Sequence, residues 1–362
     1  MFKSFEKTIN WLYERKPSML CIDINSDSIK LLVMKKLRST YQVVAYAIVP
    51  FPSDIQTDSV QTAIAAISTA IKLGQHQIKS KHKFATTCVN GSSVITKILM
   101  INANLSIEDR EENILFSAKQ YVPYPLDDIN YDYEIQGVNS QNATLLDVLF
   151  VASRRENVSI RTQVLLNAGI TAKIIDIDIY ALKNACTLLS EYVEKTLNNE
   201  VIGIINIGET NSLFLITQND QILFSREQDF GGKQLIIALQ EAYQCTYDSA
   251  TNRKRTITLP DNDPFDVLAS FLKELSDQIK RILQIFNLSN TCSSHVGSVF
   301  IAGENASLPK LKQTLTSNLK LPVFLCNPFI DMSVDASINR NDLNDVAPAL
   351  LIACGLAIRS FG

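Results

Sequence analysis

The stretch L-C-I-D-I-N-S-D-S-I-K-L-L-V-M-K-K, residues 20–36, has a counterpart in G-I-I-N-I-G-E-T-N-S-L-F-L-I-T-Q-N, residues 203–219. In each, an apolar run leads through a turn of small polar residues into a second apolar run, which is the pattern of a β-hairpin. The two turns share a register, and the aligned pairs are Asp23 with Asn206, Asn25 with Gly208, and Ser28 with Asn211.

Turns of this kind point backbone N–H groups and hydroxyls outward, an arrangement that suits phosphate oxygens. Two such hairpins facing one cleft would clamp a polyphosphate from both sides. The alternative is that both are ordinary hairpins, since short turns rich in Ser, Asn and Gly are common. The repetition favours the clamp.

Composition limits the class of protein. A chain of 362 residues is long enough for two domains or one two-lobed unit, and 46% hydrophobic with 20% charged residues is typical of a globular protein. A net charge of −3 provides no general attraction to nucleic acid. Seven cysteines without a C-x-x-C pair, and three histidines without ligand spacing, favour reduced thiols in a cytosolic setting over a metal or disulfide framework.

Two segments bear on membrane contact. Residues 1–16 place Phe2, Phe5, Ile9 and Leu12 at helical spacing among basic residues, which indicates either a terminal helix packed on the protein, the interpretation we favour, or a membrane-surface helix. Val346–Ile358 is the longest apolar stretch and is too short to span a bilayer, so we expect a buried helix that closes the fold.

Between the hairpins and after them, strands alternate with helices in each half, which indicates an α/β fold. A helix is expected over Ser59–Leu73, ended by Gly74. Another is expected after Ser106, with Asp109 completing its cap, Ile107 on its buried side and Pro123 ending it.

Later elements are expected as follows. Ala172–Ile179 should be a strand, and Lys233–Tyr243 and Pro264–Phe286 should be helices. The polar stretch between those two helices, which contains Arg253–Arg255, is expected to be a loop.

Several segments resemble the type IV pilus assembly protein PilM family, which is part of the actin-like superfamily. They include Glu112–Tyr133 with its Y-V-P-Y-P turn, Ser225–Gly232 (S-R-E-Q-D-F-G-G), Val299–Leu311 (V-F-I-A-G-E-N-A-S-L-P-K-L) and the ending A-P-A-L-L-I-A-C-G-L-A-I-R. The duplicated hairpins resemble the phosphate-1 and phosphate-2 loops of that superfamily. The resemblance covers roughly residues 17–359, with the motifs in the right order.

The resemblance implies a two-lobed actin-like fold with an inserted 1C-type subdomain. The implied division is an amino-terminal segment 1–16, subdomain 1A in 17–83 and 154–199, the insertion 84–153, subdomain 2A in 200–232 and 296–345, subdomain 2B in 233–295, and a closing helix 346–362.

It also implies ATP and Mg²⁺ as cofactors. Asp23 would hold magnesium through water, and Asp178 would orient the attacking water, unless it is simply a helix N-cap. The positions that align with the family's nucleotide site are Asp23, Asn25, Ser26, Ser28, Lys30, Asn206, Gly208, Thr210, Asn211, Lys254, Gly303, Glu304 and Asn305.

The chain departs from the family at this site. Asn25 replaces a usual glycine, Asn206 replaces an aspartate, and Glu304-Asn305 replaces Gly-Ser, so that one glycine remains there to admit the purine. Asp27 and Glu209 add negative charge beside a polyphosphate. Two interpretations stay open: a working ATPase, or a site with weak nucleotide binding that is retained as structure.

The implied partner is the short cytoplasmic tail of a PilN-like membrane protein, bound in a groove between subdomains 1A and 1C. The expected walls are Asn90, Gly91, Tyr121, Pro123, Tyr124 and Pro125. Aromatic residues beside prolines lose little rotamer freedom on binding. The alternative is that Tyr121 and Tyr124 pack the core of the insertion.

The resulting hypothesis is a cytoplasmic scaffold at the cytoplasmic face of the inner membrane. It would bind a PilN-like protein and other pilus platform proteins, and would reach the membrane only through its partner. The alternatives are an active, switching or polymerising ATPase similar to the cell-division protein FtsA, and a related component of a pilus or type II secretion platform. A sugar kinase fits less well, because no glycine-rich phosphate loop accompanies a catalytic base.

Overall fold

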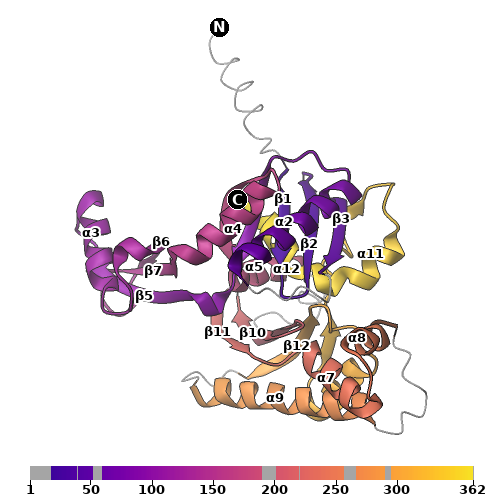
Figure 1. Ribbon diagram of the computed structural model, residues 1–362. Coiled ribbons are helices and arrows are strands. Elements are labelled where there is room, and N and C mark those ends of the chain that lie inside the picture. Colours follow the sequence, from indigo (N-terminus) through magenta and orange to yellow (C-terminus); the bar gives the residue numbers. More distant parts are fainter. Residues whose placement is uncertain are drawn as a thin grey trace.

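The computed structural model describes residues 18–38, 40–51, 59–189, 201–219, 221–256, 266–289 and 295–361. The expected amino-terminal segment, residues 1–16, lies outside this range, as does the expected helix start at Pro264. Two lobes each contain one large sheet, and a smaller sheet with a helix projects from the first lobe (Figure 1).

The first hairpin forms the centre of the first lobe's sheet. The sheet order is β14-β3-β2-β1-β4-β8, with β1 antiparallel to β2 and parallel to β4. All of β1 is buried, and apart from Asp23 its residues are apolar, as expected of a strand that is covered on both faces. The strands are β1 (Leu20–Ile24), β2 (Ser28–Lys36), β3 (Tyr41–Pro50), β4 (Phe84–Val89), β8 (Thr171–Ile177) and β14 (Ser333–Val334).

The second hairpin has the same place in the second lobe. Its sheet has the order β11-β10-β9-β12-β13, again an antiparallel meander followed by parallel strands on the other side of the first strand. The repeated hairpins of the sequence are therefore equivalent elements of two similar sheets. The strands are β9 (Val201–Ile207), β10 (Ser212–Gln218), β11 (Gln221–Gln228), β12 (Val296–Ala302) and β13 (Val323–Leu325).

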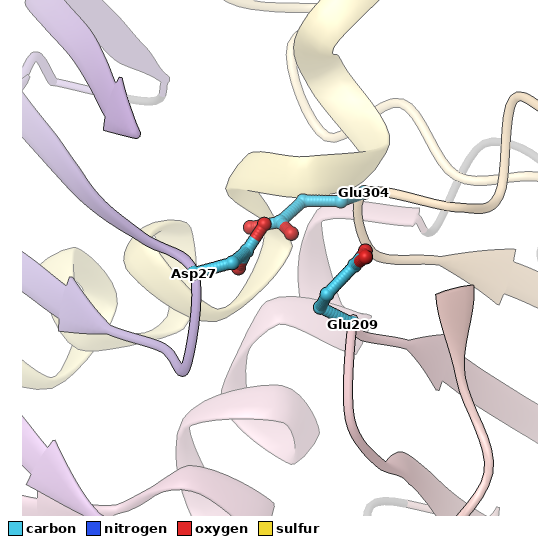
Figure 2. A group of neighbouring side chains, drawn as sticks. All are labelled: Asp27, Glu209 and Glu304. Carbon is cyan, nitrogen blue, oxygen red and sulfur yellow. The ribbon is translucent and has the colours of Figure 1, made fainter. Parts of the chain in front are cut away.

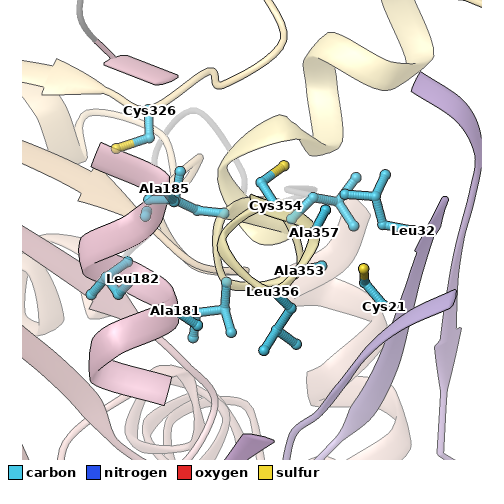
Figure 3. Close-up of a cluster of buried hydrophobic side chains, with 14 of the residues drawn as sticks. Cys21, Leu32, Ala181, Leu182, Ala185, Cys326, Ala353, Cys354, Leu356 and Ala357 are labelled. Carbon is cyan, nitrogen blue, oxygen red and sulfur yellow. The ribbon is translucent and has the colours of Figure 1, made fainter. Parts of the chain in front are cut away.

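Two helices, α5 (Asp178–Cys186) and α12 (Leu351–Phe361), lie between the sheets. They share one apolar cluster with Cys21 and Leu32 of the first sheet and with residues of the second, and Figure 3 shows α12 nearly end-on beside α5. The two helices cross closely, because a Cβ on Gly355 would lie 1.7 Å from the carbonyl oxygen of Ala181. This confirms the expected buried helix at the carboxy-terminal end.

Helix α12 continues a helical run that begins with α11 (Arg340–Val346). Among the described residues, Arg340–Phe361 alone is long and apolar enough to cross a membrane, but 67% of its apolar window is buried inside the protein. We therefore describe this run as part of the core.

Outer helices complete the layers. The far face of the first sheet packs on α2 (Val60–Gln77) and α4 (Arg155–Asn167). The far face of the second packs on α7 (Gly232–Tyr243), α9 (Val267–Ser289) and α10 (Leu311–Leu319). Each of the two sheets thus contributes to the shared central core and to one core of its own.

Three expectations for these elements were wrong. Helix α2 does not stop at Gly74 but runs to Gln77, and the missing Cβ of Gly74 lets Leu31 approach to 2.6 Å from where that atom would be. Strand β8 ends at Ile177, and α5 begins directly after it. The expected loop around residues 253–255 is a helix, α8 (Tyr247–Thr256), because tertiary packing of Ala250 outweighs its polar composition.

The projecting sheet is an insertion between β4 and α4. Its order is β5-β7-β6, and α3 (Ile107–Ala118) covers one face. The strands are β5 (Val94–Asn102), β6 (Ile129–Val138) and β7 (Leu145–Arg154). The expected cap is confirmed, since the Ser106 hydroxyl accepts a hydrogen bond from the Asp109 N–H (3.1 Å) and donates one to its carboxylate (2.7 Å).

Two details of α3 differ from expectation. Ile107, at the start of the first turn, is 80% exposed, whereas Ile114 and Ala118 later in the helix are buried. The helix ends at Ala118, well before Pro123, so the proline does not terminate it.

The helix crossing gives a direct test of the layered core. We expect Gly355→Ala to lower the free energy of unfolding by about 3 kcal/mol, because the added methyl group overlaps backbone that cannot rotate away. Urea unfolding followed by circular dichroism measures the change. Gly203→Ala is the control, since a Cβ there meets its nearest atom at 3.5 Å. Equal losses for both variants would contradict the close crossing.

Candidate functional site

The two hairpin turns face each other across the boundary between the lobes. In the first, the Asn25 N–H donates to the Ser28 carbonyl (2.9 Å), and in the second the Gly208 N–H donates to the Asn211 carbonyl (3.0 Å). The tips touch directly, because the Thr210 hydroxyl donates to the Ser26 hydroxyl (3.2 Å). The aligned registers of the sequence thus correspond to the same local geometry.

The asparagine at position 25 does not strain the backbone. Asn25 is not among the described residues with positive φ, so its turn does not require glycine. In the orientation that satisfies its amide, Asn25 donates to Asp23 Oδ1 (3.0 Å) and accepts from Lys30. The replacement therefore adds a polar side chain inside the hairpin, where glycine would leave space.

A buried ion pair joins the lobes at this point. Lys30 is 1% exposed and pairs with the carboxylate of Glu304, which follows β12 in the second lobe. The Ser28 hydroxyl donates to the same carboxylate (2.6 Å). Asp23 also contacts Lys30, at 3.7 Å, and is 2% exposed. A carboxylate from the second lobe thus occupies the donors of the first hairpin.

Gly303 permits this approach. Its φ is +91°, and a Cβ would lie 2.4 Å from the Ile207 carbonyl oxygen, so neither the conformation nor the space suits another residue. The glycine that the sequence associated with a purine is here required by the contact between β12 and β9. Next to it, Asn305 is 1% exposed and its amide donates to the Gly208 carbonyl (2.7 Å).

Three carboxylates gather around the hairpin tips. Oxygens of Asp27, Glu209 and Glu304 lie within 4.8 Å of one another, and Figure 2 shows their side chains pointing toward a common point. Glu209 forms an ion pair with Lys254 of α8. Of the three, Glu304 and Glu209 are therefore each neutralised by a lysine.

The third carboxylate, Asp27, is neutralised by a proton. Burial and then the negative charge of Glu304 raise the pKa of Asp27 to about 8. For Glu304, burial alone would raise the pKa, but the charge of Lys30 and hydrogen bonds from Asp27, Lys30 and Ser28 outweigh it and hold the pKa at about 2. At neutral pH the pair therefore consists of a protonated Asp27 and an ionised Glu304.

These contacts test the fit of ATP and magnesium. Asp23 has an oxygen, Oδ2, without a hydrogen-bond partner, which suits a water on a magnesium ion. The donors that would hold phosphate do not fit, because Ser28 and Lys30 are already bound to Glu304 and Lys254 is bound to Glu209. The residues as they lie do not accommodate a polyphosphate at the first hairpin.

A cleft of about 810 Å³ opens beside the tips. One wall is apolar and comes from α2, with Ala63, Ala66 and Ile67, and the other is polar and comes from α7 and α8, with Lys233 and Arg255. Of the predicted nucleotide-site residues, Asn25, Ser26, Thr210 and Lys254 line this cleft. Asn206 and Gly208 belong to the second hairpin, and Asn211 donates to Glu227 rather than facing a ligand.

Asp178 lies at the start of α5 and not at an N-cap. Ile177 is the N-cap, and the Asp178 carboxylate accepts a hydrogen bond from the Gly91 N–H (2.8 Å). Burial raises the pKa of Asp178 to about 7, against the opposing effect of that hydrogen bond. The N-cap alternative is therefore wrong, and the water-orienting role remains a prediction.

A second cleft, of about 360 Å³, lies at the base of the insertion. Pro123 and Tyr124 line it together with Ser93, Ile129 and Arg154. The guanidinium of Arg154 lies over the Tyr124 ring at 5.3 Å. Two of the residues expected to form a partner groove thus border a cleft.

The other predicted wall residues do not line this cleft. Tyr121 lies under the ammonium of Lys97 at 5.5 Å, and Pro125 caps a short 3₁₀ turn. The Asn90 side chain accepts from Arg161 (3.2 Å), while Gly91 is held by Asp178. Tyr121 and Tyr124 are 43% and 41% exposed, so they do not pack the core of the insertion as the alternative proposed.

Sequence reasoning missed two features of these sites. The sequence indicates only that Asp27 and Glu209 are charges unfavourable to phosphate, whereas Asp27 shares a proton with Glu304 and Glu209 binds Lys254. The pairing of Lys30 with Glu304 was also missed. Its signal is the lysine in I-K-L at residues 29–31, because a lysine inside an apolar buried strand requires a buried anion.

Comparison with solved structures agrees with this architecture. The chain is similar to a structure of the PilM-PilN type IV pilus biogenesis complex, with a TM-score of 0.80 and 20% identity over 96% of this chain and 99% of that chain. It is also similar to the ethanolamine utilization protein EutJ from Carboxydothermus hydrogenoformans, with a TM-score of 0.54 and 12% identity over 96% of this chain and 90% of that one.

Duplicated sheets, facing hairpins and these likenesses define a two-lobed actin-like fold. A sequence model of the type IV pilus assembly protein PilM matches residues 21–361. The chain therefore belongs to the PilM family, as the sequence motifs indicated.

The proton on Asp27 predicts a pH-dependent stability. Asp27 ionises near 3.8 when unfolded and near 8 when folded, so the stability it contributes is complete below about pH 4 and is lost as the pH rises through 8. We expect Asp27→Asn to raise the melting temperature over wild type by about 3–6 °C at pH 9, and by much less at pH 5.

Differential scanning fluorimetry between pH 5 and 9 measures this difference. Over that interval Glu304 is ionised in the folded and the unfolded protein, so it does not contribute to the change of stability with pH. The substitution leaves Lys30 and Glu209, the other charged residues that face Asp27, in place. A difference in melting temperature that is the same at both pH values would contradict the shared proton.

Proposed function

We propose that this protein is a cytoplasmic scaffold of the type IV pilus inner-membrane platform. It binds the short cytoplasmic tail of a PilN-like membrane protein in the cleft at the base of the insertion. It stands at the cytoplasmic face of the inner membrane and reaches the bilayer only through that partner. Other platform proteins dock on the same scaffold.

The observation that carries this proposal is the 360 Å³ cleft bordered by Tyr124 and Pro123. Family membership supports the pilus assignment, and the similar solved structure is a PilM-PilN complex, so a protein with the same fold does bind such a partner. An exposed aromatic ring beside a proline offers a rigid apolar anchor to an incoming peptide.

The local backbone also suits an extended tail. In the described part of the chain β5 and β6 are the edges of the three-stranded sheet, so each has a row of backbone groups available for an added strand. Val94 and Ile129 give the cleft an apolar lining, and Ser92 and Ser93 add hydroxyls at its rim. Main-chain pairing would supply affinity, and the cleft would select the apolar side chains of the tail.

We propose in addition that the nucleotide site is degenerate. The donors of the first hairpin are occupied by Glu304, and the lysine that would approach the nucleoside is paired with Glu209. The competing function is an active actin-like ATPase that switches or polymerises, and the 810 Å³ cleft is the feature that favours it.

The degenerate site predicts ATP hydrolysis near background and weak ATP affinity. Turnover of the purified protein with magnesium is measured beside Asp23→Ala, which removes a carboxylate whose unpartnered oxygen suits a magnesium-bound water. We expect the two rates to be indistinguishable. A robust wild-type rate abolished by Asp23→Ala would establish the ATPase instead.

The cleft predicts an anchor role for Tyr124. We expect Tyr124→Ala to weaken binding of a PilN-like tail peptide by about 1–2 kcal/mol, or roughly 5- to 30-fold in Kd, while the fold is retained. Isothermal titration of the peptide into the folded variant measures the loss.

Phe116→Ala is the matched control. Phe116 is an equally large aromatic residue of the insertion, 73% exposed on α3, and it does not line the cleft. We expect the Phe116→Ala variant to bind the tail peptide with the affinity of the wild type. Unchanged affinity for Tyr124→Ala would move the tail site elsewhere on the protein.

A further inference from the structure

We propose that the Glu304 carboxylate is a built-in ligand of the first hairpin, which fills its anion site and fastens the two lobes together without a nucleotide. The proposal rests on the degenerate nucleotide site and explains what replaces the missing ligand. It does not involve the cleft at the base of the insertion, so it is independent of tail binding.

The first step of the argument is the convergence of donors. The Ser28 hydroxyl and the Lys30 ammonium both bind the Glu304 carboxylate, and both belong to the strand that follows the first turn. Ser28 and Lys30 are 3% and 1% exposed. A hydroxyl and an ammonium buried together on one hairpin form an anion site, and the anion they hold comes from the other lobe.

The second step is the need of Lys30 for that anion. A buried ammonium is strongly unfavourable unless it is paired at close range. The only other carboxylate within ion-pair distance in the described residues is Asp23, whose oxygen is 3.7 Å away, too far for a good hydrogen bond. Glu304 is therefore the main partner of this charge.

The third step is that Glu304 is presented by a rigid turn. The Gly303 N–H donates to the Pro348 carbonyl (2.8 Å), and the Asn305 N–H donates to the Ile207 carbonyl (3.2 Å). The Asn305 side chain adds a bond to the Gly208 carbonyl (2.7 Å). Gly303 is thus fixed to the turn that precedes α12, and Asn305 to the second hairpin, so the carboxylate between them is held at the position where it meets the first lobe.

It follows that the two lobes are held together at this point by Glu304, without an external ligand. An external anion must displace Glu304 before it can reach Ser28 and Lys30. Removing the carboxylate should leave an empty anion site with its donors intact, and a magnesium-bound oligophosphate, whose net charge the metal lowers, should then fill that site.

The experiment is chemical rescue of Glu304→Ala. We expect the variant to melt at least about 5 °C below wild type, because Lys30 loses its main partner. Addition of millimolar magnesium pyrophosphate should recover at least half of that loss, while shifting wild type by less than about 1 °C. Differential scanning fluorimetry follows both shifts.

The double variant Lys30→Met/Glu304→Ala is the control. It lacks the cation of the anion site, so pyrophosphate should give no recovery. Recovery of the double variant to the same extent as the single one would overturn the proposal, as would a single variant that melts with wild type. If Glu304→Ala does not fold, Glu304→Gln keeps the side-chain shape and removes only the charge. It should still melt below wild type without recovery by pyrophosphate, and a Glu304→Gln variant that melts with wild type would overturn the proposal.

Failures of the related proposals appear in other measurements. A nucleotide site that works would show as a large ATP-dependent shift in wild type itself. Failure of the scaffold proposal would show as absence of tail-peptide binding to wild type, whereas we expect Glu304→Ala to bind that peptide within about twofold of wild type.

Discussion

The close crossing of α5 and α12 is the constraint on which the rest of the molecule depends. Gly355 lets α12 lie directly against the backbone of Ala181, so the two helices form one thin layer. Both large sheets pack on that layer through a shared apolar cluster. Because the sheets are tied to the same layer, the turns that follow β1 and β9 meet at its edge, with Thr210 touching Ser26.

At that edge, polar chemistry replaces apolar packing. Two lysines, four carboxylates and one shared proton lie in a small volume: Lys30 pairs with Glu304 and also contacts Asp23, Lys254 pairs with Glu209, and Asp27 holds the proton. The donors of the first hairpin are thus bound by a side chain of the protein itself. The family's fold has thus been kept while Ser28 and Lys30, which would hold a phosphate, bind a carboxylate of the protein instead. The cleft bordered by Tyr124 lies elsewhere, at the base of the insertion.

The sequence predicted the large elements because their signals are local. Repeated hairpins, the Ser106 cap and the apolar carboxy-terminal run each specify one element within a short window. It failed where a distant contact decides the outcome. Helix α2 continues past Gly74 because Leu31 packs against the glycine, and α8 forms because Ala250 is buried against other helices. In the site, hairpin residues could be aligned by register, but the pairing of Lys30 with Glu304 spans the two lobes.

The way the insertion joins the first lobe has a consequence for how this protein can change. Val94 pairs with Ser153, and the Ser153 hydroxyl donates to the Ser93 carbonyl (3.0 Å), so the entering and leaving chains lie side by side. Strand β4 pairs with β1 and with β8, and in the part of the chain that the structure describes neither β4 nor β8 pairs with a strand of the insertion. The insertion is therefore a cassette: its length and surface can be exchanged between such neighbouring ends while every strand of the two lobes keeps its register.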